Sequence, residues 1–456
     1  MLALSAQLEA IESAMSFGVA GGVAAVSGLT IEAVDLPLPV GSLCRIFVGG
    51  SESRTAAAEV IGFAGDRTLL MALSNVGGVA RGDRIDLVTS SPRVWCSDGL
   101  LGRVINGLGE PIDSGPPLPR TVSRRIDQKC VTPMDRVNIR EPITTSVRAI
   151  DALHTCGRGQ RMGIFSGPGV GKSTLLSQIA KNTDADVSVV ALIGERGREI
   201  QEFIENALGP EGMKRCVMVV ATSDETALLK VRAAKIACAI AEYFRDAGRD
   251  VLMMMDSLTR LAQAQRQIGL AAREPPATKG FPPSVFGLLP EIMERAGRTA
   301  AGSITGFYTV LVEGDDFNEP IPDAVKGISD GHLWLNRALA AKGHFPAIDV
   351  IQSISRVRGD VCDPAHVRLA RRVLALMATY DEIADLVSIG AYVPGLNAEH
   401  DLAAAARPRI VEFLKQDSLT PTTLDEAKQQ LTQLIAWIDQ MEKVIAAATA
   451  KAQARK

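Results

Sequence analysis

The residues with the strongest chemical signature lie in one stretch, RMGIFSGPGVGKSTLL, from 161 to 176. A short apolar run leads into three closely spaced glycines and a Lys-Ser-Thr triplet, after which an apolar helical pattern begins. Glycines let the backbone turn so tightly that successive N–H groups point at one anion, such as a phosphate chain. The following helix would direct its positive amino-terminal end at the same phosphates. The stretch therefore predicts a P-loop, a strand–loop–helix unit that binds nucleotide phosphates.

Within this loop the side chains have separate expected roles. Lys172 would reach the β- and γ-phosphates, and the Ser173 hydroxyl would bind Mg²⁺. The strict motif opens with glycine, and here that position is Ser166. We expect the nucleotide to be held by Gly167, Pro168, Gly169, Val170, Gly171, Lys172, Ser173 and Thr174.

Two acidic residues follow apolar runs further along the chain. In VLMMMDSLTR, Asp256 would hold the water shell of Mg²⁺ opposite Ser173, although a helix-capping role is the alternative. In VALIGERGREI, Glu195 would align and polarise the attacking water, and Arg196 would neutralise the charge that develops there. The alternative for this segment is a salt-bridged surface cluster, because it is charged throughout.

A third cluster, GHFPAIDVIQSISR, carries a candidate base platform and a candidate arginine finger. Phe345 precedes a proline and would stack on a purine, although an aromatic is more often a core residue. Arg356 follows a predicted Ser-Ile-Ser turn and would act as an arginine finger. If a neighbouring subunit supplies that finger, catalysis requires oligomerisation.

The composition limits the class of protein. With 49 basic and 52 acidic residues the net charge is -3, which argues against the basic face of a nucleic-acid-binding protein. The seven cysteines are scattered without a C-x-x-C pair, so we expect reduced thiols in a cytosolic protein rather than a disulfide framework. We expect no secretory signal, because the first fifteen residues lack a basic stretch and carry two Glu, and no membrane span, because the apolar runs are short.

Alternating patterns from 151 onward indicate a mostly parallel sheet that is covered on both faces. Strands are predicted at 162–165, 187–193, 217–221, 251–255 and 308–312, and helices at 173–181, 198–208 and 225–245. Ligands of such sheets bind where the strands reach their carboxyl ends. The predicted P-loop and the two acidic residues therefore belong at one edge of the sheet.

Other regions differ in character. Residues 1–15 have the apolar spacing of a helix, which either packs on its own domain or docks a partner or a membrane surface. Residues 18–90 alternate in short runs with frequent turns, which predicts a small β-barrel or sandwich. From about 360 the pattern is helical. We place an N-terminal helix and barrel at 1–95, the ATP-binding domain at 96–360 and a helical domain at 361–456.

The motifs, in this order, resemble the rotary-type ATPase family, which comprises the catalytic subunits of F-, V- and A-type machines and their export relatives. The segments GPGVGKST, GERGRE, MDSLTR and PAIDVIQSIS match that family, as does LGRVINGLGEPID. The segments GRGQRMGIF, EPPATKGFPPSVF, GSITGFYTVLVEGDD and DLVSIGAY look most like the type III export ATPases. In these segments the chain most resembles the flagellum-specific members, and the virulence (injectisome) members are very similar to them.

The resemblance implies an α/β RecA-like P-loop core, preceded by a small N-terminal β-barrel and followed by a C-terminal α-helical domain. It implies ATP hydrolysis with Mg²⁺ held at Ser173 and Asp256. It makes Glu195 the catalytic carboxylate and Arg196 a phosphate contact. By the same resemblance, Phe345 is the adenine platform and Arg356 the finger that acts on a neighbour.

The resemblance also implies partners. It predicts a homohexamer around a central stalk protein, with a stator-like regulatory subunit on the N-terminal helix. The C-terminal domain would meet the export gate, chaperones and exported proteins. The protein would be cytoplasmic and peripheral at the inner-membrane export apparatus, and no nucleic-acid partner is expected.

Two other classes share the motifs. A hexameric RecA-like nucleic-acid translocase would need exposed aromatics in its N-terminal module, and residues 18–90 contain only Phe47 and Phe63. The catalytic subunit of an F- or V-type ATP synthase would explain the nucleotide motifs but not the export-like segments. The sequence does not separate flagellar from virulence export, because both groups share these motifs.

Overall fold

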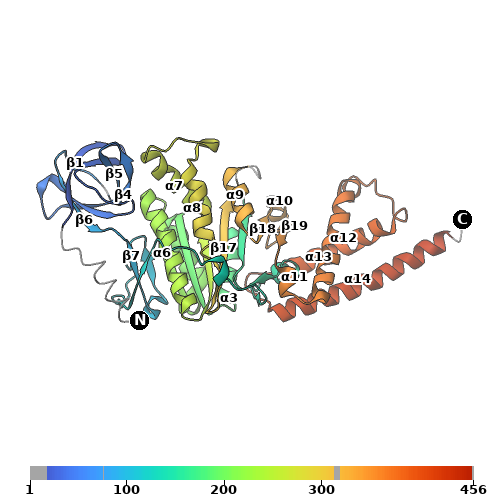
Figure 1. Cartoon of the computed structure of the whole chain (residues 1–456). Helices are drawn as coiled ribbons and strands as arrows, with labels where there is room; N and C mark the ends of the chain where they lie inside the picture. The colour runs from blue at the N-terminus through green and yellow to red at the C-terminus, as the bar shows by residue number, and fades with distance from the viewer. Residues whose placement is uncertain (1–17, 75, 313–318, 454–456) are drawn as a thin grey trace.

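The computed structural model describes residues 18–74, 76–312 and 319–453. A β-barrel, a large sheet between helices and a helical region follow one another along the molecule in chain order (Figure 1). This confirms the predicted order of β-barrel, α/β core and C-terminal helical domain. The helix predicted at 1–15 lies outside the described residues. Among the described helices, none has the length and apolar character needed to cross a membrane.

The first unit is a closed barrel with the strand order β1-β2-β5-β4-β3-β6. Its strands are β1 (Ala20–Ser27), β2 (Thr30–Val34), β3 (Leu43–Phe47), β4 (Thr55–Ala64), β5 (Arg67–Ala72) and β6 (Arg84–Thr89). Inward-facing residues such as Ile31, Cys44 and Ile46 are buried, and they alternate with more exposed neighbours. Because closure of the sheet pairs both edges of every strand, this unit is a barrel, which is one of the two alternatives that the sequence predicted, and not a sandwich.

The second unit is a nine-stranded sheet with the order β19-β18-β12-β17-β15-β13-β14-β8, to which β16 adds beside β17. Its strands are β8 (Val104–Asn106), β12 (Arg161–Ser166), β13 (Val187–Glu195), β14 (Cys216–Thr222), β15 (Asp250–Asp256), β16 (Gly297–Arg298), β17 (Ser303–Leu311), β18 (Gly331–Leu335) and β19 (Ile348–Ser355). Neighbours from β18 to β8 pair in parallel, whereas β19 and β16 run antiparallel to their partners. The carboxyl ends of the parallel strands therefore share one edge.

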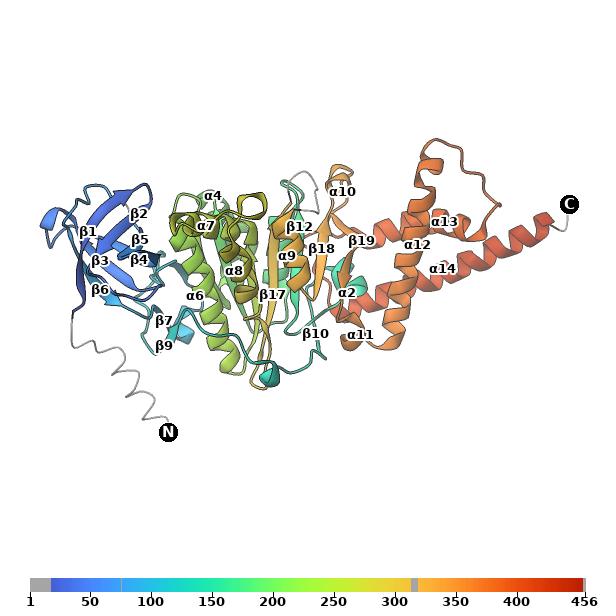
Figure 2. The same cartoon turned by 45° about the horizontal axis from the view of Figure 1, so that its top comes forward.

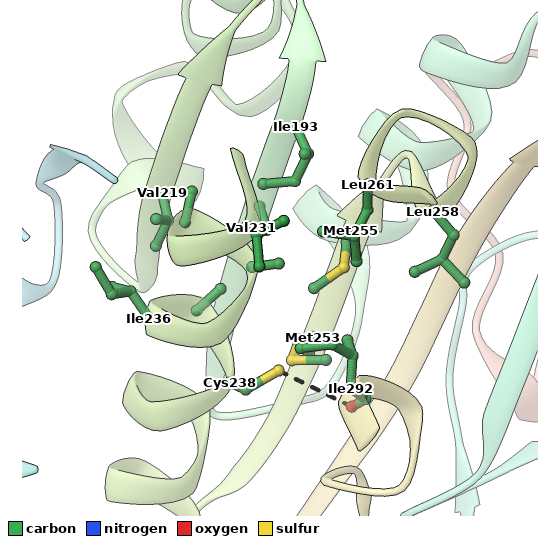
Figure 3. Close-up of a cluster of buried hydrophobic side chains, with 14 of the residues drawn as sticks. Ile193, Val219, Val231, Ile236, Cys238, Met253, Met255, Leu258, Leu261 and Ile292 are labelled. Carbon is green, nitrogen blue, oxygen red and sulfur yellow. Dashed lines mark hydrogen bonds between the residues drawn. The ribbon is translucent and has the colours of Figure 1, made fainter. Parts of the chain in front are cut away.

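Helices cover both faces of this sheet (Figure 2). One face packs against α6 (Ala227–Asp246), α7 (Leu258–Ala271) and α8 (Pro283–Met293). Figure 3 shows this core, where Ile193, Met253 and Met255 of the strands meet Val231 of α6 and Leu261 of α7. The other face packs against α2 (Arg148–Leu153) and α3 (Lys172–Asn182). Burial on both faces explains the continuous apolar runs of the strands.

Shorter elements connect these layers. The helical ones are α4 (Gly197–Glu202), a π-helical segment (Phe203–Leu208), α5 (Gly209–Met213), α9 (Pro320–Ile328), α10 (Arg337–Ala341) and α11 (Arg358–Val361). Two small antiparallel pairs join β7 (Arg93–Cys96) to β9 (Val122–Arg125) and β10 (Pro142–Ile143) to β11 (Cys156–Gly157). The predicted helix at 198–208 is thus α4 continued by a π-helical turn.

The third unit consists of α12 (Pro364–Ser388), α13 (Ala398–Leu414) and α14 (Leu424–Gln453). Its apolar residues join the same hydrophobic cluster as α2 and α3, so this unit packs directly on the nucleotide-binding core. The Arg148 side chain adds polar contacts, because its Nε donates to the Phe413 oxygen and its Nη1 to Gln430 Oε1. The end of α13 is thereby held beside the start of the core.

A buried ion pair joins α6 to the end of α8. Arg295 and Glu242 meet in a bidentate contact, with Nε–Oε1 and Nη2–Oε2 distances of 2.7 Å, and their side chains are 1% and 4% exposed. Arg295 Nη1 also donates to the Ile126 oxygen at 2.8 Å. Each charge is therefore compensated in a medium where an unpaired charge would be costly.

Removing one partner of this pair tests its role. We expect Arg295→Met to lower the free energy of unfolding by about 3–5 kcal/mol, because Glu242 then remains buried without a counter-charge. The measurement is urea unfolding followed by circular dichroism. The double variant Arg295→Met/Glu242→Leu should recover most of the loss, and equal destabilisation in both variants would contradict this explanation.

Candidate active site

The predicted P-loop connects the carboxyl end of β12 to the start of α3. Gly169 and Gly171 have φ angles of +76° and +88°, a region that side chains other than glycine rarely adopt. Lys172 is the first residue of the eleven-residue helix α3. Ser166 is buried, and its hydroxyl has no hydrogen-bond partner among the described residues. The loop backbone and the helix amino terminus thus share one location, as an anion site requires.

Lys172 is in direct contact with the acid at the end of β15. Its Nζ donates to Asp256 Oδ1 in a salt bridge whose side chains are 13% and 8% exposed. Thr309 of β17 donates from Oγ1 to the same oxygen at 2.7 Å. The acid is therefore oriented by a neighbouring strand and already faces a positive charge.

Glu195 reaches the same place from the next strand. Leu192 of β13 pairs with Asp256 of β15, and the ladder between β13 and β14 shifts register between Ile193 and Glu195. Gly194, at the shift, has a φ of +75°. A bulge of this kind redirects a side chain. Glu195 is 9% exposed, and its Oε1 has no hydrogen-bond partner among the described residues.

The surroundings of Glu195 favour its neutral, protonated form. Burial, and after it the charge of Asp256, raise the pKa of Glu195 to about 7. A hydrogen bond with Glu199 acts in the same direction, whereas Lys172 and Arg260 oppose it. A carboxylate with a pKa near 7 is suited to polarise water at neutral pH.

Glu195 and Asp256 line one cavity of about 340 Å³. Its walls include Ser173 and Thr174 of α3, Glu195, and Asp256. Ser418 and Leu419, from the loop between α13 and α14, close it from the C-terminal unit. The C-terminal unit therefore contributes a loop to this cavity.

The same cavity offers suitable ligands for Mg²⁺. The Ser173 hydroxyl and the Asp256 carboxylate both line it, and oxygen atoms of this kind are the ligands that Mg²⁺ prefers. Asp256 already binds the Lys172 ammonium as a counter-charge. The donor set therefore fits a divalent cation held between α3 and the end of β15.

Two other predicted residues flank the pocket. The Phe345 ring lies beside the P-loop, since a Cβ placed on Gly171 would be 3.5 Å from its Cδ1 and Cε1 atoms. The ring is exposed and therefore available for stacking. Arg196 lies at the start of α4 with its side chain 77% exposed, and its nearest acid is Glu199 at 3.7 Å. The structure thus places Phe345 at the loop and Arg196 at the outer rim.

Arg356 lies at the opposite edge of the sheet. Met162, at the amino end of β12, pairs with Gly331, and Gly331 pairs with Ser355 of the antiparallel β19. Ser166, at the carboxyl end of β12, pairs with Leu335 instead. Four residues of strand, about 13 Å, therefore separate the base of Arg356 from the start of its own P-loop.

The predicted Ser-Ile-Ser turn before Arg356 is wrong. Residues 353–355 are the last part of strand β19, where Ile354 pairs with His332 and Ser355 with Gly331. Pairing with β18 provides ladder hydrogen bonds, so two serines do not suffice to form a turn. Arg356 consequently follows directly after the last residue of strand β19.

The sequence prediction missed Arg260. This residue lies in the first turn of α7, four residues after Asp256, and its Nε is buried without a hydrogen-bond partner among the described residues. It is close enough to Glu195 to lower the pKa of that carboxyl. A Cβ on Gly194 would be 3.1 Å from the Arg260 Cβ, so glycine at 194 allows this approach. Its place within MDSLTR was the available signal.

The raised pKa of Glu195 leads to a pH prediction. Below about pH 7 the carboxyl is largely protonated and cannot accept a hydrogen from water, so kcat/KM for ATP should rise with pH through this region. Glu199→Gln should move this rise to lower pH, because an amide can donate to the ionised Glu195. The measurement compares kcat/KM against pH for the wild type and for Glu199→Gln. The titration of ATP affects both profiles equally and cancels in the comparison. Identical profiles would contradict the assignment.

Comparisons with known proteins agree with this geometry. The model described as the ATP synthase alpha/beta family, nucleotide-binding domain, matches residues 146–355, and that of the T3SS EscN ATPase C-terminal domain matches residues 362–433. The flagellum-specific ATP synthase of Bacillus subtilis (strain 168) is 49% identical and covers 94% of this chain and 98% of its own length. The type 3 secretion system ATPase of Xanthomonas euvesicatoria is 44% identical, with 90% and 93% covered.

Solved structures give the same result. The assembled ATPase EscN from the enteropathogenic E. coli type III secretion system superposes with a TM-score of 0.86 at 42% identity, and covers 91% of this chain and all of its own. EscN in complex with its central stalk EscO superposes with a TM-score of 0.83 at 41% identity, with the same coverage. This chain therefore belongs to the family of flagellum-specific ATP synthases and type 3 secretion system ATPases.

Proposed function

We propose that this chain is the ATPase of a type III protein export apparatus and that it hydrolyses ATP to ADP and phosphate for the export of flagellar proteins. The family assignment supports export, and several of its most similar relatives are named flagellum-specific. Two relatives named type 3 secretion system ATPases are 44% and 46% identical, which supports virulence (injectisome) export as the second candidate. The chemistry at the site is the same in both cases.

One observation carries the proposal. Lys172, Glu195 and Asp256 converge at the carboxyl edge of the sheet, beside a glycine loop and a helix amino terminus. The loop amides and Lys172 would bind the phosphates, so that the Lys172 ammonium exchanges a carboxylate oxygen for a phosphate oxygen. Ser173 and Asp256 would hold Mg²⁺, which neutralises phosphate charge when bound.

The remaining residues act on the attacking water and on the charge that develops. Ionised Glu195 would accept a hydrogen bond from the water and orient it. Arg260 and Arg196 would stabilise negative charge at the γ-phosphate. Phe345 would stack on the adenine base, and the loop residues Ser418 and Leu419 would close the pocket.

We propose that Arg356 completes the site of a neighbouring copy. Its position at the amino edge keeps it away from the P-loop of its own chain, which supports action in trans. A homohexamer around a central stalk protein would supply such neighbours, as in the EscN assembly with its stalk EscO. The segment at 1–15 would bind a stator-like subunit, and the C-terminal unit would meet the export gate, chaperones and exported proteins. The protein would be cytoplasmic and peripheral at the inner-membrane export apparatus.

Two substitutions test the chemical assignment. Lys172→Ala should abolish both tight ATP binding and turnover, whereas Glu195→Gln should lower kcat by about 100-fold or more and keep nucleotide binding. The matched control is Glu205→Gln, an exposed acid on the same segment whose side chain accepts from Gln201. Steady-state hydrolysis and fluorescent-nucleotide binding measure both effects. Wild-type turnover in Glu195→Gln would overturn the assignment.

A further inference from the structure

The backbone of Arg356 is held by a buried polar group that the motifs do not include. The Arg356 N–H donates to the Asp330 oxygen at 3.0 Å. Gln160, which is fully buried, donates from Nε2 to the same Asp330 oxygen at 3.1 Å. Its Nε2 also donates to Ser355 Oγ at 3.2 Å, one residue before Arg356. One side-chain amide therefore contacts both Ser355, which precedes Arg356, and Asp330, whose backbone oxygen accepts from the Arg356 N–H.

Gln160 is itself fixed at its other end. The Gly157 N–H donates to Gln160 Oε1 at 2.9 Å, and the Gly306 N–H donates to the Gln160 backbone oxygen at 2.9 Å. With its oxygen and its nitrogen both bonded and no exposure to water, the side chain has little freedom to move.

Asp330 is locked as firmly. Its carboxylate accepts from the backbone N–H of Arg161 at 3.0 Å, and from Arg161 Nε and Nη2 at 2.9 Å each. Its backbone N–H donates to the Arg161 oxygen at 2.8 Å. Gly331 follows, and a Cβ there would lie 3.1 Å from both Gln160 Nε2 and the Ser355 Cα. The packing around the base of Arg356 therefore leaves no spare room.

The Arg356 side chain itself is exposed. The guanidinium lies at the end of a long flexible side chain. Its position in an assembly therefore depends on how firmly the Arg356 backbone is held at the end of β19. Misplacing a charge-stabilising group by about 1 Å can cost about 100-fold in rate.

We propose that Gln160 is a positioning residue for the arginine finger, through its paired contacts with Asp330 and Ser355. This inference rests on the proposed role of Arg356 in the neighbouring site. Among the described residues, the hydrogen bonds of Gln160 go to Gly157, Gly306, Asp330 and Ser355, none of which lines the cavity at the P-loop, so its effect should appear in the turnover of a neighbour and not in the binding of ATP.

A double-mutant cycle tests the proposal. Gln160→Leu should lower kcat by about 10-fold or more at a protein concentration where the assembly is complete, while KM for ATP stays within about 2-fold of wild type. In an Arg356→Ala background, the same change should cost nothing further, because the group that it positions is gone. A purely structural role would instead lower the activity of both backgrounds by the same factor, and such additivity would overturn the proposal.

The control and a second variant keep the test decisive. Thr305→Val removes a comparable buried bond next to Gln160, the one from the Gly159 N–H at 2.9 Å, without touching Asp330 or Ser355, and should leave kcat unchanged. If Gln160→Leu does not fold, Ser355→Ala removes one of the two contacts and enters the same cycle. Full activity of Arg356→Ala would contradict the proposed finger itself. Full activity of Gln160→Leu beside an inactive Arg356→Ala would overturn only the positioning role.

Discussion

The parallel pairing of β12 with β17 and β18 is the constraint on which the rest of the structure depends. Parallel strands bring their carboxyl ends to one edge, which is why a loop after β12 and acids after β13 and β15 meet without any sequence proximity. The same pairing also determines which groups of one chain are kept apart. Because β19 returns antiparallel along β18, its last residue lies at the amino edge, and Arg356 is carried away from its own P-loop. An active site that uses Arg356 would therefore need the Arg356 of a neighbouring copy.

The charges at this edge of the sheet act on one another. Lys172 rests on Asp256, while the adjacent Glu195 has a pKa raised to about 7 by burial and by Asp256. Glu195 and Asp256 are therefore two neighbouring acids that both interact with the Lys172 ammonium. Phosphates and Mg²⁺ would give each of these charges a partner.

Much of this architecture could be predicted from the sequence, because long buried strands and a glycine loop leave strong local patterns. The P-loop unit, the strands before Glu195 and Asp256, and the order of barrel, core and helical domain are all of this kind. Features set by long-range pairing could not be predicted. The sequence predicts a turn at 353–355, where the structure has the end of β19, because the pairing of this segment with β18 leaves no local signal. Arg260 approaches Glu195, and the loop with Leu419 approaches the cavity, only through tertiary packing. The catalytic roles themselves stay predictions until activity is measured.

The most direct test of a site shared between chains is the dependence of ATPase activity on protein concentration, measured for wild type and Arg356→Ala. We expect the specific activity of the wild type to rise cooperatively as copies associate, and we expect the variant to remain at a low activity at every concentration. A specific activity that does not depend on concentration and survives the substitution would contradict the account, because each chain would then complete its own site.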